Sequence, residues 1–304
     1  MFSQLTIEER ECDARRVPPL IVLGCGYVGS RLARAALGAG DPVRVCARST
    51  GRLQPLGTAG AEVKYLDVAV PKQLGPAMAS LPGATVLYSI PASSPLPPGL
   101  SVRNALQASY GAAAGAFIYL SSSGLYGATP DDDVWVDEST PLVQDDPAMK
   151  NVLADEAELE RCAFDRLRVV TLRLAPVYGP GRGVRARLAK GDYRLVDDGV
   201  HAISRIHVDD VARVVFAAAE RATNKSTYLV ADDEPTTQRD YASWLCERMK
   251  IAMPPSRALY EPGAPRTAHR NRKIRNAKMK RELGIELRYP TFREGEAAIE
   301  AELG

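Results

Sequence analysis

The sequence predicts an α/β fold in which a doubly wound parallel β-sheet is covered by helices on both faces. Short apolar runs rich in β-branched residues alternate along the chain with segments whose apolar residues recur at helical spacing. This alternation is typical of βαβ units and of the parallel sheets that they build. The runs are mostly apolar throughout, which indicates strands that are buried on both faces. A chain of 304 residues is long enough to bury such a core.

The predicted elements follow one another in a regular order. Strands are expected at 20–25, 42–47, 62–67, 85–90, 116–122 and 167–174. Helices are expected at 28–40, 101–116, 148–165 and 208–222, and residues 226–231 can add an edge strand after the last of them. The Pro-rich segment 91–101 is expected to be a loop.

The alternation of strands and helices stops near Gly179, which predicts a second, smaller part of the protein. Residues 179–205 and 232–304 are interpreted as a C-terminal substrate lobe over the carboxyl ends of the strands, where ligands of open α/β sheets bind. Residues 18–178 and 206–231 form the predicted main domain, and residues 1–17 form a polar N-terminal tail.

Composition and charge exclude several classes of protein. A net charge of +2 is too small to indicate a nucleic-acid or membrane-surface protein, and no apolar run reaches the roughly 18 residues of a spanning helix. The N-terminal residues include charges where the apolar part of an export signal would lie. Five cysteines without a Cys-x-x-Cys pair indicate reduced thiols rather than disulfides or a zinc site. We therefore expect a soluble cytoplasmic protein with no metal, nucleic-acid or membrane partner.

A glycine-rich turn follows the first predicted strand. The segment "IVLGCGYVGSRLA" places a Gly-x-Gly-x-x-Gly motif at Gly24, Gly26 and Gly29, between a strand and a helix. In this context the first glycine permits a tight turn, the second lets backbone approach a pyrophosphate, and the third allows close packing of helix on strand. The motif therefore predicts a Rossmann-type NAD(P) site that includes Tyr27 and Val28, although a purely structural turn is the alternative.

The end of the second strand indicates which dinucleotide is bound. The acidic residue that would accept the ribose hydroxyls of NAD is replaced by Ala47, and Arg48 follows it. An Arg at this place accommodates a 2′-phosphate, so NADP is favoured over NAD unless Arg48 is merely a solvated turn residue. Asp67 ends the third strand and can bind the adenine amino group or cap the next turn. The other predicted cofactor contacts lie at or just beyond the ends of later strands: Ile90, Pro91 and Ser121.

Several motifs in order give the chain a wider resemblance. They are "GCGYVGS", "LDVAV", "FIYLSSSGLYG", "VDESTP", "LRLAPVYGPGRG", "RIHVDDVARVV" and "KIRNAKMKRELG". From Leu20 to about Ile299 the sequence resembles the extended short-chain dehydrogenases/reductases, which include nucleotide-sugar epimerases and dehydratases. The resemblance implies that Ser122 binds the substrate oxygen and that Pro176 contacts the cofactor. It also implies that His207 anchors the substrate lobe and that a homodimer forms through long helices beside the site.

One catalytic feature of that superfamily has no counterpart here. Its members place a Tyr and, four residues later, a Lys on one face of the helix, where the Lys lowers the pKa of the Tyr. The stretch "DDPAMKNVLADE" looks like the start of this helix, with a Pro just inside it and an acidic first turn. It puts Ala148 and Val152 at the two positions, and Lys150 about 200° around the helix from Ala148. The chain thus resembles the atypical extended subgroup, which lacks the active-site Tyr.

Three side chains are candidates to manage the proton of a reaction. Ser122 can orient a carbonyl oxygen, but its hydroxyl is too weak an acid to act unaided. Tyr126 is either a proton donor or a packing residue of its turn, and Tyr178 is interpreted as loop packing. Asp155 lies seven residues after Ala148 and therefore on the same helix face. Its acidic neighbours in "DEAELE" favour a solvated carboxylate instead.

A basic segment near the C-terminus bears on the kind of substrate. Eight Lys/Arg lie between Arg266 and Arg281, with no Asp or Glu among them. A solvated face is the simplest interpretation, and an electropositive rim for an anionic substrate is the alternative. The acidic segment 129–140, with an exposed Trp135, can flank the same cleft.

Together these features predict a class of function rather than one reaction. The leading hypothesis is an NADP-dependent oxidoreductase or epimerase that acts on a small metabolite, with an anionic one accommodated by the basic segment. A non-catalytic NADP(H)-binding sensor or scaffold is the alternative, and an isomerase that retains the cofactor structurally is a third.

Overall fold

The structure is a computed structural model that describes residues 18–92, 96–129, 134–162, 164–258, 261 and 271–303. The chain divides into two compact units, each made of three chain segments. The first unit comprises Met1–Ser121, Ala148–Leu172 and Ala212–Thr227, and the second comprises Ser122–Pro147, Arg173–Val211 and Tyr228–Gly304. The predicted assignment of a cofactor domain and a substrate lobe stays a prediction about what these parts bind.

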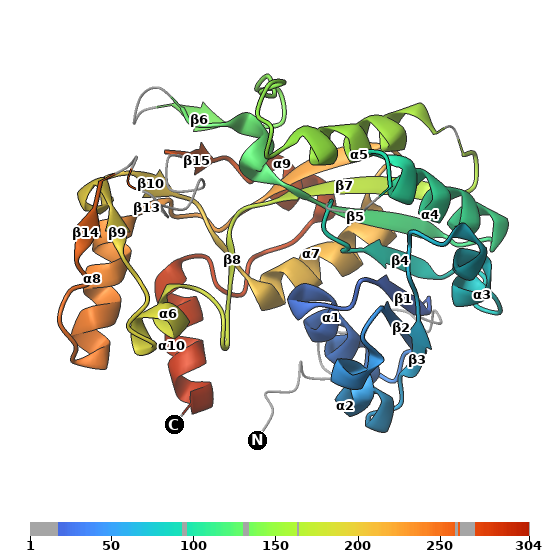
Figure 1. Cartoon of the computed structure of the whole chain (residues 1–304), viewed down its shortest axis with the longest axis horizontal. Helices are drawn as coiled ribbons and strands as arrows, with labels where there is room; N and C mark the ends of the chain where they lie inside the picture. Colours follow the sequence, from blue (N-terminus) through green and yellow to red (C-terminus); the bar gives the residue numbers. More distant parts are fainter. Residues whose placement is uncertain are drawn as a thin grey trace. The chain divides into compact units, whose positions relative to one another are not determined.

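A seven-stranded parallel sheet confirms the predicted fold class (Figure 1). The order of its strands is β12-β7-β5-β4-β1-β2-β3. The strands are β1 (Leu20–Leu23), β2 (Val43–Ala47), β3 (Glu62–Tyr65), β4 (Thr85–Tyr88), β5 (Ala116–Ser122), β7 (Arg168–Leu174) and β12 (Ser226–Val230). The chain moves outward from β1 through β3 and then returns to β4 on the other side of β1. This reversal is the point at which open α/β sheets bind ligands.

Helices cover both faces of this sheet, as the alternating pattern predicts. The helices are α1 (Tyr27–Gly38), α2 (Gln54–Thr58), α3 (Leu74–Met78), α4 (Leu100–Gly111), α5 (Lys150–Arg161) and α7 (Val208–Arg221). The helix α4 packs against both α3 and α5, and α1 packs against α2. Figure 1 shows α4 and α5 on one side of the sheet and α1 on the other. Every residue of β1 and β4 is buried between these layers, which explains their continuous apolar runs.

The helix α5 begins later than the sequence predicts. Its N-cap residue is Met149, and the Leu153 N–H donates to the Met149 carbonyl, so Pro147 and Ala148 lie in the preceding turn. No acidic residue lies in the first turn of the helix. The predicted helix start with Pro just inside is therefore wrong, because the fixed φ of Pro suits a turn as well as a first helical turn.

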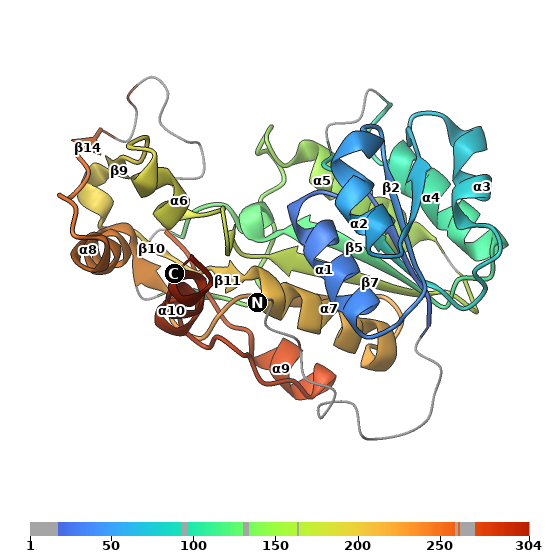
Figure 2. The ribbon, with the colours of Figure 1, turned by 90° about the horizontal axis from the view of Figure 1, so that it is seen from below.

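In the residues that the structure describes, the second unit contains short ladders and four further helices outside the predicted strand–helix alternation. The strands are β6 (Trp135–Val136), β8 (Val177–Tyr178), β9 (Leu195–Val196), β10 (Ala202–Ile203), β11 (Ile206–His207), β13 (Thr236–Thr237), β14 (Ser256–Arg257) and β15 (Lys273–Ile274). The helices are α6 (Val184–Ala189), α8 (Gln238–Met249), α9 (Ala277–Leu283) and α10 (Phe292–Leu303). Strands of two residues are too short to show a period in a sequence. Figures 1 and 2 show β9 and β14 beside α8.

Candidate cofactor site and catalytic turn

Two of the three motif glycines are required by the protein's own packing. Gly24 has a φ of +85°, and a Cβ on it would lie 2.6 Å from Cγ1 of Ile90 and 2.9 Å from the Ile90 backbone nitrogen. A Cβ on Gly29 would lie 2.7 Å from Cγ1 of Val22 in β1. These contacts match the predicted roles of the first and third glycines, a tight turn and close packing of α1 on the sheet.

The remaining glycine, Gly26, faces open space. Apart from the neighbouring residues in the chain, no described residue has an atom closer to a Cβ at Gly26 than the Gly24 carbonyl oxygen, at 3.9 Å, and its φ of −92° lies outside the left-handed region that favours glycine. Gly26 is the N-cap of α1, and no acidic residue lies in the first turn of that helix. The first N–H groups of a helix and its dipole favour an anion there. The missing side chain and the lack of a side-chain cap on this helix end therefore fit the pyrophosphate of a dinucleotide.

Arg48 and Asp67 lie just beyond neighbouring strands of the first unit. Arg48 follows β2 and is exposed, which leaves its guanidinium accessible to a phosphate. Asp67 follows β3, and its Oδ1 accepts a hydrogen bond from the Ala69 N–H at 3.0 Å. The carboxylate therefore caps the next turn, and its predicted contact with adenine stays a prediction.

The other predicted cofactor contacts in the first unit differ in their exposure and in their contacts with the rest of the protein. Ile90 packs directly beside Gly24, and Pro91 is exposed. Tyr27 and Val28, in the first turn of α1, are partly buried. The Ser121 hydroxyl donates to Oε1 of Glu156 at 2.5 Å and is buried, so it is bound to α5.

The two predicted catalytic residues lie in one turn of the second unit. Ser122 caps the 3-10 turn Ser123–Tyr126, and its Oγ accepts the Gly124 N–H at 3.0 Å, which leaves the hydroxyl proton for another partner. Tyr126 is buried, and Nη1 of Arg173 donates to its hydroxyl oxygen at 2.6 Å. The same guanidinium lies 5.3 Å from the Tyr126 ring centroid. Tyr126 therefore packs within its turn and is also paired with a cation, so both of its predicted roles remain open.

A buried arginine that the sequence does not single out binds the backbone of this turn. Nη1 of Arg272 donates to the Ser123 carbonyl at 2.6 Å, and Nε donates to the Gly127 carbonyl at 2.9 Å, with a further bond from Nη2 to Gly127. The side chain is 6% exposed, so the interpretation of the basic segment as a solvated face is wrong for Arg272. Residues 266–270 of that segment and 130–133 of the acidic one lie outside the described residues, and Trp135 is exposed as predicted.

Other residues that the resemblance emphasised occupy different environments. His207 is 1% exposed and makes edge contacts with the rings of Tyr178 and Tyr289. Tyr178 is likewise buried, and burial together with nearby carboxylates raises the pKa of its hydroxyl. Pro176 is exposed, and its carbonyl accepts the Ile206 N–H at 3.1 Å.

The helix α5 has a buried carboxylate where the sequence favours a solvated one. Asp155 is 4% exposed, and Oδ2 accepts the hydroxyl of Tyr119 at 2.9 Å. The solvated interpretation of Asp155 is therefore wrong, because this side of α5 packs on β5. Ala148 and Lys150 are exposed and Val152 is partly buried. Tyr119 was missed, although it alternates with Ser121 along β5 and so shares its face of the sheet.

Comparisons with known proteins extend this description. The chain matches the NAD dependent epimerase/dehydratase family over residues 20–231. A 3-diazoavenalumate denitrifying reductase from Streptomyces sp is 31% identical over 201 residues, which make up 60% of this chain and 65% of the reductase. The chain thus matches less than two thirds of that relative.

Solved structures agree with this match. A functionally unknown conserved protein from Silicibacter pomeroyi DSS is 30% identical, with a TM-score of 0.78 and coverage of 94% of this chain and 99% of that one. MoeE5 in complex with UDP-glucose and NAD has the same fold at 21% identity, with a TM-score of 0.76 and coverage of 94% and 100%. Among the described helices, none has the length and apolar character needed to cross a membrane. The sheet, the glycine turn and a match over most of the sequence together make this chain a member of the NAD dependent epimerase/dehydratase family.

Proposed function

We propose that the protein is an NADP(H)-dependent oxidoreductase of the atypical extended type that acts on a small metabolite. The observation that carries the proposal is the open space at Gly26, at an N-terminus of α1 that no side chain caps. The name of the Streptomyces relative, a reductase, supports reduction over epimerisation. The complex of MoeE5 with UDP-glucose supports an anionic substrate as one candidate class.

The preference for NADP rests on Arg48. An exposed guanidinium after β2 can form charge-assisted hydrogen bonds with a 2′-phosphate, and no carboxylate stands at Ala47 to repel it. We expect Arg48→Ala to weaken NADPH binding by about 30-fold, because one such bond contributes about 2 kcal/mol. Isothermal titration calorimetry measures this effect, and NADH binding is the control because it lacks the phosphate. Equal losses for both cofactors would contradict the assignment.

Ser122 is the proposed orienting group for the substrate oxygen. A reduced nicotinamide, when bound, would supply hydride, and the residues of the chain would position the substrate and manage the proton. The Ser122 Oγ is fixed by the Gly124 N–H, so its own hydrogen can be donated to an oxygen that becomes more negative during reduction.

Removing this hydroxyl gives a direct test. We expect Ser122→Ala to lower kcat/KM by about 10- to 100-fold, because one donor to the developing charge is lost. NADPH affinity should stay unchanged. The assay is the loss of NADPH absorbance with a panel of ketones, aldehydes, imines and diazo compounds. Binding of NADPH without any turnover across the panel would instead favour the sensor or scaffold.

Two groups on the chain can supply the proton of the reduction. Tyr126 has Arg173 beside its hydroxyl, and a cation there would stabilise the phenolate left after proton transfer, in place of the Lys of the superfamily. Asp155, a buried carboxyl in the first unit, is the other candidate.

A further inference from the structure

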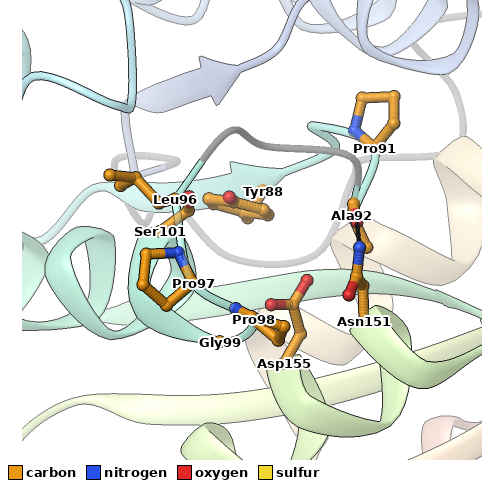
Figure 3. Close-up of a pocket in the computed structure, with 10 residues that line it drawn as sticks. All are labelled: Tyr88, Pro91, Ala92, Leu96, Pro97, Pro98, Gly99, Ser101, Asn151 and Asp155. Carbon is orange, nitrogen blue, oxygen red and sulfur yellow. Dashed lines mark hydrogen bonds between the residues drawn. The ribbon is translucent and has the colours of Figure 1, made fainter.

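A small hollow lies within the first unit, between the end of β4 and the helices α4 and α5. Figure 3 shows the residues that line it, which are Tyr88, Pro91, Ala92, Leu96, Pro97, Pro98, Gly99, Ser101, Asn151 and Asp155. Its accessible volume of about 10 Å³ suits about one water molecule. Pro91 belongs to the predicted cofactor contacts, so the hollow shares a wall residue with that site.

Polar groups from different elements line this hollow. Asp155 and Asn151 extend from α5, and Tyr88 lies at the end of β4 (Figure 3). Asn151 is fixed by its Nδ2, which donates to the Ala92 carbonyl at 2.7 Å. Prolines and Leu96 form the apolar part of the remaining wall, and Ser101 adds a further polar side chain to it. An ordered water with several polar partners is stable in such a place.

The carboxyl group of Asp155 is placed by three elements. It accepts the Tyr119 hydroxyl from β5 and the Gly99 N–H at the start of α4. Gly99 has a φ of +82°, and a Cβ on it would lie 2.9 Å from the Ala154 carbonyl oxygen, so only glycine lets α4 begin this close to α5. The site is therefore built by the fold and does not depend on a flexible side chain.

The acidity of Asp155 results from opposing effects. Burial raises the pKa of its carboxyl to about 6, while the hydrogen bonds from Tyr119 and Gly99 oppose this shift, and Glu158 and Glu156 of the same helix add to it. Glu158 is bound by Arg103 of α4. The tyrosines that face Asp155, Tyr119 and Tyr88, have raised pKa values because of burial and its charge, so they stay protonated. Among the groups that face the hollow, Asp155 is the one that exchanges a proton near neutral pH.

We propose that Asp155, held by Tyr119 and Gly99, is the acid of a proton relay that passes through a water in this hollow. The inference rests on the proposed function and assigns the proton source that Ala148 and Val152 cannot provide. For a carbonyl substrate, a bound reduced nicotinamide would supply the hydride to the carbon and become oxidised, and the oxygen would gain the proton of the water, which gives an alcohol. The water takes the Asp155 proton as the Asp155 O–H bond breaks. The resulting carboxylate regains a proton from solvent before the next turnover.

The test compares Asp155→Asn with Tyr126→Phe and a matched control, Glu160→Gln, which alters an exposed carboxylate on the same helix. Asn keeps the shape of Asp and still accepts the Tyr119 hydroxyl, but it donates no acidic proton. With NADPH and the substrate panel, we expect Asp155→Asn to lower kcat by about 100-fold at unchanged NADPH affinity. Wild-type kcat should fall as pH rises above about 6, and this dependence should be absent in Asp155→Asn and present in Glu160→Gln.

Carboxyl ¹³C NMR gives a readout that needs no substrate. The resonance that disappears in Asp155→Asn should titrate with a midpoint near pH 6 in the wild type, and higher in Tyr119→Phe, which removes a bond to the charged form. A midpoint near that of an ordinary Asp would overturn the relay. So would full turnover by Asp155→Asn, with the rate lost in Tyr126→Phe instead. Absence of turnover by the wild type, with NADPH bound, would reject the proposed function itself.

Discussion

Replacing Gly26 by Ala is expected to weaken NADPH binding by about 1,000-fold and to leave the melting temperature within about 2 °C of the wild type. Apart from the neighbouring residues in the chain, no described residue has an atom within 3.9 Å of the new Cβ, and the φ of −92° lies outside the left-handed region that favours glycine. A pyrophosphate that needs this space would lose its close approach to the N–H groups of α1. Several charge-assisted hydrogen bonds of about 1.5–3 kcal/mol each would weaken together.

Gly24→Ala is the matched control for this variant, because the same change two residues away has a different physical cost. Its Cβ would lie 2.9 Å from the Ile90 backbone nitrogen, which cannot move aside, and φ is +85°. We expect a loss of about 3 kcal/mol in the free energy of unfolding. Differential scanning calorimetry and NADPH titration of both variants check the pair. A Gly26→Ala protein that binds NADPH normally would show that the glycine turn is purely structural.

The sequence predicts best those elements whose structure depends on residues close to one another in the chain. The run 20–23 consists of apolar residues alone, and this composition already indicates a strand that is buried on both faces. Gly24 and Gly29 are required by contacts close to the turn between β1 and α1, two elements that are adjacent in the sequence. The fold class and the glycine turn depend on such contacts, and both were predicted with nearly the right boundaries. The start of α5 was predicted wrongly, because Pro147 is compatible both with a turn and with the first turn of a helix.

The roles of Asp155 and Arg272 depend on residues far away in the chain. Asp155 meets Tyr119, 36 positions earlier, and Arg272 meets Ser123, 149 positions earlier. In the sequence both have charged neighbours of the same sign, "DEAELE" and "RNRKIR", which is typical of solvated surfaces. Tertiary packing determines whether these two side chains are buried, and the pattern of neighbouring residues in the sequence does not indicate it. For this reason the burial of Asp155, and the bonds of Arg272 to the turn that follows Ser122, became visible only in the structure.

Arg272→Met is expected to lower the free energy of unfolding of the second unit by about 4 kcal/mol, or its melting temperature by about 8–16 °C. Met has a similar length and no charge, so the variant tests the hydrogen bonds rather than the volume. The buried carbonyl of Ser123 and the half-buried carbonyl of Gly127 would lose a charged donor, and an orphaned buried acceptor costs about 1–3 kcal/mol. Both tryptophans of the chain, Trp135 and Trp244, lie in this unit, so tryptophan fluorescence follows its unfolding.

Arg275→Met separates this effect from a general loss of positive charge. Arg275 is exposed and lies 5.4 Å from the Trp135 ring centroid, so its replacement should cost less than about 1 kcal/mol. If Arg272→Met unfolds at the same denaturant concentration as Arg275→Met, the hydrogen bonds from Arg272 to the turn do not stabilise the second unit. If only Arg272→Met is destabilised, the turn that contains Ser122 and Tyr126 depends on a residue from the far end of the chain. Its geometry would then change with the packing of β15, although neither β15 nor Arg272 belongs to the predicted catalytic residues.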